Sequence, residues 1–151
     1  MSSSIILLAE DNANDEELTL MALRRSKIKN EIKVVRDGQE ALDYLFAEGP
    51  YAGRDLNDPP DLVLMDINLP RVNGLEVLKR IRADERTRTQ PVVVLTSSAE
   101  ERDRFAAYHH FANSYIRKPV DFDQFVESVR QLGLYWLVLN EAPPLPRAKA
   151  A

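Results

Sequence analysis

The sequence predicts an α/β domain in which helices cover both faces of a parallel β-sheet. Three short segments, residues 5–9, 62–65 and 92–95, are almost wholly apolar, as strands buried on both faces of a sheet are. Amphipathic helical segments alternate with the strands along the chain, which is the order that βαβ units produce. In open sheets of this kind, ligands bind beyond the carboxyl ends of the strands.

The helix after the first strand has a start signal of its own. Asn14 and Glu17 stand three residues apart, in the arrangement of a capping box, so we expect the helix to begin after Asn14. Its apolar residues Leu18, Met21 and Ala22 recur at spacings of three and four, and we expect them to face the sheet.

The remaining elements follow from the same two periodicities. Further strands are expected at 32–35 and 114–116, and further helices at 39–46, 74–83, 99–111 and from 121 onward. Between 47 and 60, several glycines and prolines break both patterns, which predicts a loop of unusual length. The side chains expected to face the sheet are Ala41, Leu42, Leu45 and Phe46 in the helix 39–46, and Leu75, Leu78 and Ile81 in the helix 74–83.

Length and charge restrict the class of protein. A chain of 151 residues is long enough for one compact domain with a proper core. A net charge of −4 argues against non-specific binding to nucleic acid or to an anionic membrane. The sequence has no apolar stretch of about 20 residues and no signal-peptide pattern at its start, so we expect a cytoplasmic protein. The absence of cysteine excludes disulfides and thiol chemistry.

Polar and charged side chains stand where the predicted strands end. Glu10 and Asp11 follow the first strand, Asp66 the third and Thr96 the fourth, and Lys118 comes after the fifth. The carboxyl ends of parallel strands share one edge of a sheet, so the three acids should crowd together. Two unit charges about 4 Å apart repel by roughly 4 kcal/mol at an effective dielectric constant of about 20. Such a cluster needs a cation or retained protons, and an all-oxygen ligand set suits Mg²⁺.

Acids at strand ends can also serve only to cap the helices that follow. Asp11 or Asn14 could cap the first helix in this way. Asp66, in contrast, precedes a loop that contains Pro70, and no helix is predicted to begin there. Its position therefore favours a functional role.

Four segments lie at these strand ends: Ala9-Glu10-Asp11-Asn12, Leu64-Met65-Asp66-Ile67-Asn68-Leu69-Pro70, Val94-Leu95-Thr96-Ser97 and Ile116-Arg117-Lys118-Pro119. They resemble the signatures of receiver domains in two-component signalling, and the resemblance extends from about residue 5 to residue 132. It implies a flavodoxin-like, doubly wound (βα)₅ fold with strand order 2-1-3-4-5. The core of the domain is then expected at 5–132. The apolar residues that follow predict an extended C-terminal helix over 133–140, within a single domain over 1–140, and the proline-rich composition of 141–151 predicts a disordered tail.

The resemblance implies a role for each acid of the cluster. Asp66 matches the residue that accepts a phosphoryl group from a sensor histidine kinase. Asp11 matches a direct Mg²⁺ ligand, Glu10 an acid that acts through water, and Asn68 the residue whose backbone carbonyl binds the metal. The protein would then be a signalling protein that catalyses only its own phosphotransfer and slow dephosphorylation, and not an enzyme in the usual sense.

The resemblance also implies how the signal leaves the site. Lys118 matches the lysine that pairs with the phosphoryl oxygens, and Thr96 the hydroxyl that binds them. Tyr115 matches the aromatic residue that moves together with Thr96, so that phosphorylation changes the surface of the fourth helix, fifth strand and fifth helix. The bond between Lys118 and Pro119 resembles one that is usually cis in this family.

The segment after residue 132 is apolar almost all round, whereas a surface helix needs only one apolar stripe. We expect it to form the interface of a homodimer; the alternative is that it folds back over its own domain. We expect no output domain after the fifth helix. The segment and the long loop also resemble single-domain regulators that partner bacterial phytochromes. The interface residues expected are Leu134, Tyr135, Trp136 and Val138.

Three other functions can be weighed against the receiver. A dehalogenase-type phosphatase needs a second aspartate two residues after the nucleophile, where this chain has Asn68. A flavin or nucleotide binder needs a phosphate-binding loop after the first strand, where Glu10 and Asp11 would repel phosphate. A pseudo-receiver that acts only as a phosphorylation-independent scaffold is the main alternative, although the acceptor, the acids and the lysine are all present.

Overall fold

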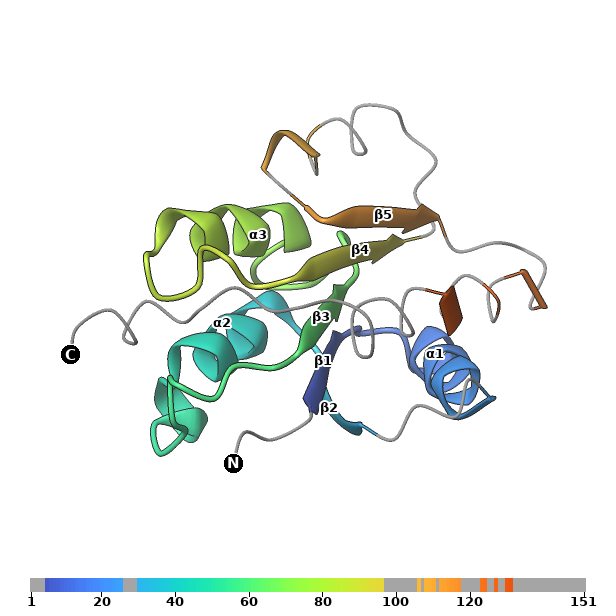
Figure 1. Ribbon diagram of the computed structural model, residues 1–151, viewed down its shortest axis with the longest axis horizontal. Helices are drawn as coiled ribbons and strands as arrows, with labels where there is room; N and C mark the ends of the chain where they lie inside the picture. Colours follow the sequence, from blue (N-terminus) through green and yellow to red (C-terminus); the bar gives the residue numbers. More distant parts are fainter. Residues whose placement is uncertain are drawn as a thin grey trace.

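The computed structural model describes residues 5–25, 30–96, 106, 108–110, 112–117, 123–124, 127 and 130–131, with only the backbone at 96 and 114–117. It contains a five-stranded parallel sheet in the order β2-β1-β3-β4-β5. Figure 1 shows α2 and α3 on one side of this sheet and α1 on the other. The elements are β1 (Ile5–Ala9), α1 (Ala13–Arg25), β2 (Glu31–Val35), α2 (Gly38–Phe46), the 3₁₀ helix η1 (Gly49–Tyr51), β3 (Leu62–Met65), α3 (Gly74–Ala83), β4 (Val92–Thr96) and β5 (Ser114–Arg117).

The predicted fold class and strand order are confirmed by this sheet. Helical residues at 106, 108–109, 123–124, 127 and 130–131 fall within the fourth and fifth predicted helices. The predicted extension at 133–140 and the tail at 141–151 lie outside the described residues. Among the described residues, no helix has the length and apolar character needed to cross a membrane.

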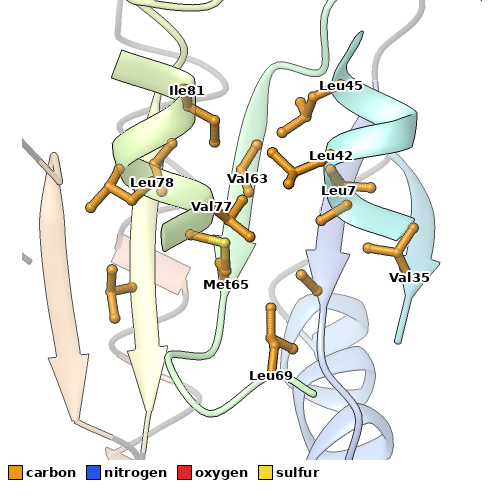
Figure 2. Packing of buried hydrophobic residues seen from close by; sticks show 14 of the residues in the cluster. Leu7, Val35, Leu42, Leu45, Val63, Met65, Leu69, Val77, Leu78 and Ile81 are labelled. Atoms are coloured by element: carbon orange, nitrogen blue, oxygen red, sulfur yellow. The ribbon is translucent and has the colours of Figure 1, made fainter. Parts of the chain in front are cut away.

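The strand side chains alternate between two hydrophobic clusters, one on each face of the sheet. Leu7 and Val63 belong to the cluster under α2 and α3, which Figure 2 shows from close by. Leu8 and Leu64 belong to the cluster under α1. All four side chains are buried, as the apolar runs predict. A strand residue's position in this alternation therefore decides which helices it faces.

Helix α1 begins earlier than the sequence suggests. It starts at Ala13, and the Oδ1 atom of Asn12 accepts a hydrogen bond from the backbone N–H of Asp15 at 3.0 Å. The backbone N–H of Glu16 donates to the carbonyl of Asn12 at 2.9 Å. The prediction of a start after Asn14 is wrong, because Asn12 is an equally good N-cap and comes first after β1. Asp15 consequently lies in the first turn of the helix.

The face that α1 turns to the sheet also differs from the prediction. Met21 is 39% exposed, so the expectation that it faces the sheet is wrong. The buried residues are Thr19, Ala22 and Leu23, and Leu18 packs at the edge of the same cluster. The inner face thus includes a polar residue, which a search for apolar periodicity does not detect.

Among the described residues, Thr19 alone has a buried side-chain oxygen without a hydrogen-bond partner. A buried hydroxyl without a partner is destabilising, and valine has the same shape without the polar atom. We therefore expect Thr19→Val to raise the free energy of unfolding by about 1 kcal/mol, measured by urea denaturation. Thr19→Ser, which keeps the hydroxyl and loses a methyl group, should be less stable than the native chain. A Thr19→Val protein of lower stability would contradict this account.

The predicted long loop between α2 and β3 is packed against α2. The guanidinium of Arg54 stacks on the ring of Tyr44 at 4.1 Å and donates hydrogen bonds to the carbonyls of Tyr44 and Asp58. Within η1, the Tyr51 hydroxyl donates to Glu40 at 2.8 Å, and its ring meets the Tyr44 ring edge-on. These contacts order a segment that has few apolar residues of its own.

Arg82 connects the end of α3 to the start of β4 and β5. Its guanidinium donates to the carbonyls of Arg88 and Gln90, at 3.0 and 2.7 Å, and to the side-chain oxygen of Asn113 at 3.0 Å. That Asn113 oxygen also accepts from the backbone N–H of Val92 at 2.7 Å. Burial lowers the pKa of Arg82 from its ordinary value. One charged side chain thus satisfies several polar groups at the amino edge of the sheet.

Asp84 is the C-cap residue of α3, and its contribution to the free energy of unfolding should depend on pH. Hydrogen bonds from the Arg86 guanidinium, at 3.0 and 2.9 Å, hold the pKa of Asp84 below its usual range. A lowered pKa in the folded state adds stability at neutral pH, which is lost as the pH falls through that pKa. We expect Asp84→Asn to cost about 0.5 kcal/mol at pH 7 and progressively less as the pH falls through the lowered pKa of Asp84, measured by denaturation at a series of pH values.

The same substitution in an Arg86→Gln background is the control. If the Arg86 side chain causes the shift, most of the pH-dependent difference disappears there. A difference of unchanged size would contradict this explanation.

Candidate functional site

Glu10 and Asp66 lie side by side at the carboxyl edge of the sheet. In the parallel pairing of β1 with β3, Leu8 is opposite Leu64, and the backbone N–H of Asp66 donates to the carbonyl of Ala9 at 3.1 Å. Two residues further along each strand, the alternation turns Glu10 and Asp66 to the α1 face. Both are buried, with 1% and 7% of their surfaces exposed. The predicted crowding of the three acids is confirmed for these two and is wrong for Asp11, which is exposed and does not lie with them.

Asp15 joins these two residues from the first turn of α1. One carboxylate oxygen from each of Glu10, Asp15 and Asp66 lies within 4.8 Å of the others. Asp15 is half-buried, whereas the other two are buried. Carboxylate oxygens are the ligands that hard cations such as Mg²⁺ prefer. These acids, the carboxylate cluster, could therefore hold a metal ion.

A short hydrogen-bonded chain positions the cluster. The backbone N–H of Asn12 donates to the Glu10 carboxylate at 3.3 Å, and the Asn12 side chain accepts from the backbone N–H of Asp15. The sequence interpretation gave Asp15 no role. Its place depends on the burial of Thr19, which lies four residues on along the same face of the helix and which a search for apolar periodicity does not detect.

Asp11, which the resemblance makes the direct metal ligand, is exposed and does not belong to the carboxylate cluster. It follows Glu10 directly, at the point where the chain has left β1. Its role in holding a metal stays a prediction.

The loop after Asp66 is fixed by hydrogen bonds to the side chain of Asp66 and to the backbone of Ile67. The N–H of Asn68 donates to Oδ1 of Asp66 at 3.0 Å, and the N–H of Gly74 donates to the carbonyl of Ile67 at 2.8 Å. A Cβ atom at Gly74 would lie 2.2 Å from the carbonyl oxygen of Asp66. Helix α3 begins at Gly74, which confirms that no helix starts at Asp66. Asn68 is exposed, and the metal-binding role of its carbonyl stays a prediction.

The same loop is held against the start of α2. The N–H of Gly38 donates to the carbonyl of Pro70 at 3.1 Å, and a Cβ atom at Gly38 would lie 1.7 Å from the carbonyl oxygen of Val72. Arg71 between them has a φ of 68°, in the left-handed region, and its guanidinium is 3.7 Å from Asp37. Both α2 and α3 therefore restrain the backbone around Asp66.

Gly74→Ala tests this close packing. The added methyl group must displace the Asp66 carbonyl, so we expect a loss of at least about 2 kcal/mol of folding free energy, measured by urea denaturation. Gly53→Ala is the matched control, because a Cβ atom there meets no atom within 4 Å. Equal stability of Gly74→Ala and the native chain would contradict the described position of α3.

The backbone places Thr96 and Tyr115 in neighbouring strands. Thr96 is the last residue of β4 and pairs with Arg117 of β5, while Tyr115 pairs with Val94. Thr96 thus lies at the predicted edge, and the roles of the two side chains stay predictions. Lys118, its bond to Pro119 and the interface residues lie outside the described residues; the interface residues are Leu134, Tyr135, Trp136 and Val138.

Comparison with known proteins identifies the family to which this chain belongs. The family model of the response regulator receiver domain matches residues 6–130 of this chain. The chain belongs to this family. It is 44% identical over 140 residues to the probable methanogenesis regulatory protein FilR2 of Methanothrix harundinacea, an alignment that covers 92% of this chain and 87% of FilR2. It is 37% identical to the response regulator Rcp1 of Synechocystis sp., covering 95% of this chain and 94% of Rcp1.

Solved structures of receivers have the same fold. The bacteriophytochrome response regulator RtBRR is 51% identical, with a TM-score of 0.76 and coverage of 94% of this chain and 85% of RtBRR. The phosphorylated cyanobacterial phytochrome response regulator RcpA is 39% identical, with a TM-score of 0.85 and coverage of 95% and 100%. The Mn²⁺-bound form of Rcp1 is 34% identical, with a TM-score of 0.84 and coverage of 93% and 99%. As a receiver, this chain is a signal-transduction component of two-component systems and not a classical enzyme.

Proposed function

We propose that this receiver accepts a phosphoryl group on Asp66 from the phosphohistidine of a sensor kinase, in a Mg²⁺-dependent reaction. The signal then leaves through the surface formed by β5 and the predicted helices at 99–111 and from 121. The observation that carries the proposal is the burial of Glu10 and Asp66 side by side at the carboxyl edge of a receiver sheet. The phosphorylated state of the relative RcpA supports it.

Asp66 has the position that a nucleophile requires. A carboxylate oxygen of Asp66 attacks the phosphorus of phosphohistidine, and an acyl phosphate bond forms as the bond from phosphorus to the histidine nitrogen breaks. The electron pair of that bond stays on the nitrogen. The hydrogen bond from the N–H of Asn68 to Oδ1 fixes the rotation of the Asp66 carboxylate. Such orientation is what an in-line displacement needs from the protein.

The oxygen ligands at the edge suit the cation that phosphoryl transfer requires. Glu10, Asp66, the carbonyl of Asn68 and the exposed Asp11 are the residues we expect to hold it. When bound, Mg²⁺ neutralises negative charge on the transferring phosphoryl oxygens. Support comes from the all-oxygen donor set of the carboxylate cluster and from the Mn²⁺-bound form of the relative Rcp1.

The remaining residues of the proposed reaction follow β4 and β5. We expect the Thr96 hydroxyl and the Lys118 ammonium to bind the phosphoryl oxygens, and Tyr115 to move with Thr96. The pairing of Thr96 with Arg117 supports this, because Lys118 is the next residue along the chain. In this proposal, phosphorylation shifts a balance between two arrangements of the signalling surface.

The names of the relatives support a particular kind of partner. RtBRR and RcpA are described as response regulators of phytochromes. We propose a sensor histidine kinase of the bacterial phytochrome type as the phosphoryl donor for this chain. Dimerisation through Leu134, Tyr135, Trp136 and Val138 remains a hypothesis from the sequence.

Acetyl phosphate tests the proposed reaction without a kinase. We expect the native chain to gain the mass of one phosphoryl group when acetyl phosphate and Mg²⁺ are present, and to gain none when EDTA removes the metal. Asp66→Asn, which keeps the shape of the side chain, should gain none under either condition. Intact-protein mass spectrometry and a phosphate-affinity gel measure the adduct.

Two outcomes would overturn the proposal. An adduct that survives Asp66→Asn would mean that another residue is the acceptor. A native chain that gains no adduct with Mg²⁺, from acetyl phosphate or from a phosphorylated kinase, would favour the phosphorylation-independent scaffold.

A further inference from the structure

We propose that Asp15 is a further acidic residue of the cation site, and that its carboxylate binds the water shell of the cation from the first turn of α1. This inference rests on the proposed function, because the cation is the Mg²⁺ of the phosphoryl-transfer reaction. The receiver signatures in this sequence include Glu10 and Asp11 but not Asp15.

The position of Asp15 carries the inference. Its carboxylate oxygen lies within 4.8 Å of those of Glu10 and Asp66. Residues four apart share one face of a helix, and Thr19, four residues on, is fully buried against the sheet. Asp15 is therefore at the end of the inner face of α1 and not on its solvent-exposed face.

Asp15 is less buried than Glu10 and Asp66, and this difference indicates its role. Glu10 and Asp66 form the buried floor of the cluster, and the half-buried Asp15 is the member nearest to solvent. Mg²⁺ gives up its waters reluctantly and keeps several of them when proteins bind it. Those waters would point toward solvent, where a carboxylate accepts their hydrogen bonds and adds negative charge to the site. Outer-shell partners of this kind commonly change metal affinity by about 10–100-fold.

The local backbone holds Asp15 in this place. Asn12 accepts a hydrogen bond from the N–H of Asp15 through its side chain, and its own N–H donates to the carboxylate of Glu10. The backbone of Asp15 and the side chain of Glu10 are thus connected through a single residue. The acid is positioned before any cation arrives, which reduces the entropy lost on binding.

A purely structural explanation is that Asp15 stabilises the positive end of the α1 dipole. The neighbouring acids of α1 allow the two explanations to be separated. Glu16 forms an ion pair with Arg36 at 2.9 Å, and Glu17 is exposed. Neither belongs to the carboxylate cluster. Glu17→Gln therefore removes one negative charge from the same end of the helix and leaves the cluster intact.

Calorimetric titration with Mg²⁺, and separately with Mn²⁺, measures the affinity of the full chain at constant ionic strength. We expect Asp15→Asn to weaken binding of both ions about 10-fold, and Glu17→Gln to weaken it less than about 2-fold, because water and salt screen a charge outside the site. Thermal unfolding without metal checks that each variant is folded. If Asp15→Asn is unstable, Asp15→Ser replaces it.

The outcomes separate this inference from the proposed function. A native chain that binds neither ion overturns both. A native chain that binds Mg²⁺ and is phosphorylated on Asp66, while Asp15→Asn binds with native affinity, overturns only the role of Asp15. Equal weakening by Asp15→Asn and Glu17→Gln would also overturn it, because the effect would then be one of net charge.

Discussion

The burial of two neighbouring carboxylates, those of Glu10 and Asp66, is the constraint on which the rest of the site depends. Parallel pairing brings the ends of β1 and β3 together, and the alternation of side chains turns both acids to the same face. Buried negative charges this close are stable only when positive charge or a proton compensates them. The edge is therefore built to attract cationic groups, and an anionic phosphoryl group can enter only together with them.

The backbone around Asp66 is fixed on several sides before any ligand binds. Its N–H is bonded to Ala9 of the neighbouring strand, its carboxylate to the N–H of Asn68, and its carbonyl is in contact with the start of α3 at Gly74. The start of α2 holds the following loop through Gly38. If Asp66 is the nucleophile that we propose, this rigid support would let it react with little loss of entropy, because positioning is a main contribution that proteins make to phosphoryl transfer.

The sequence predicts the sheet and the acid pair well because both depend on simple rules. Wholly apolar runs identify buried strands, and an acid that directly follows such a strand must lie at the carboxyl edge. The rotation of α1 is harder, because residues 20–23 are all apolar and leave several orientations equally plausible. The polar Thr19 in fact lies on the inner face, and Met21 is exposed.

Asp15 could not be assigned from the sequence for a related reason. Asn12 and Asn14 are both suitable N-caps, and a shift of two residues in the helix start moves Asp15 from the first to the third position of the helix. The packing of Arg54 on Tyr44 has no periodic signal at all, since one side chain joins the loop to the helix through a cation–π contact and a hydrogen bond. Periodicity identifies elements, and contacts between single residues decide their exact placement.

The two edges of the sheet differ in how their polar side chains are compensated. At the amino edge, two side chains are well bonded: the buried Gln90 donates to the carbonyl of Pro60 at 2.9 Å, and Arg82 binds two carbonyls and Asn113. At the carboxyl edge, the buried groups include the like charges of Glu10 and Asp66. Local energetic rules are broken where function requires it, and the rest of the fold compensates. The cost of the acidic edge is thus offset by a packed interior and a well-bonded amino edge, which lets the site keep charges that stability alone would remove.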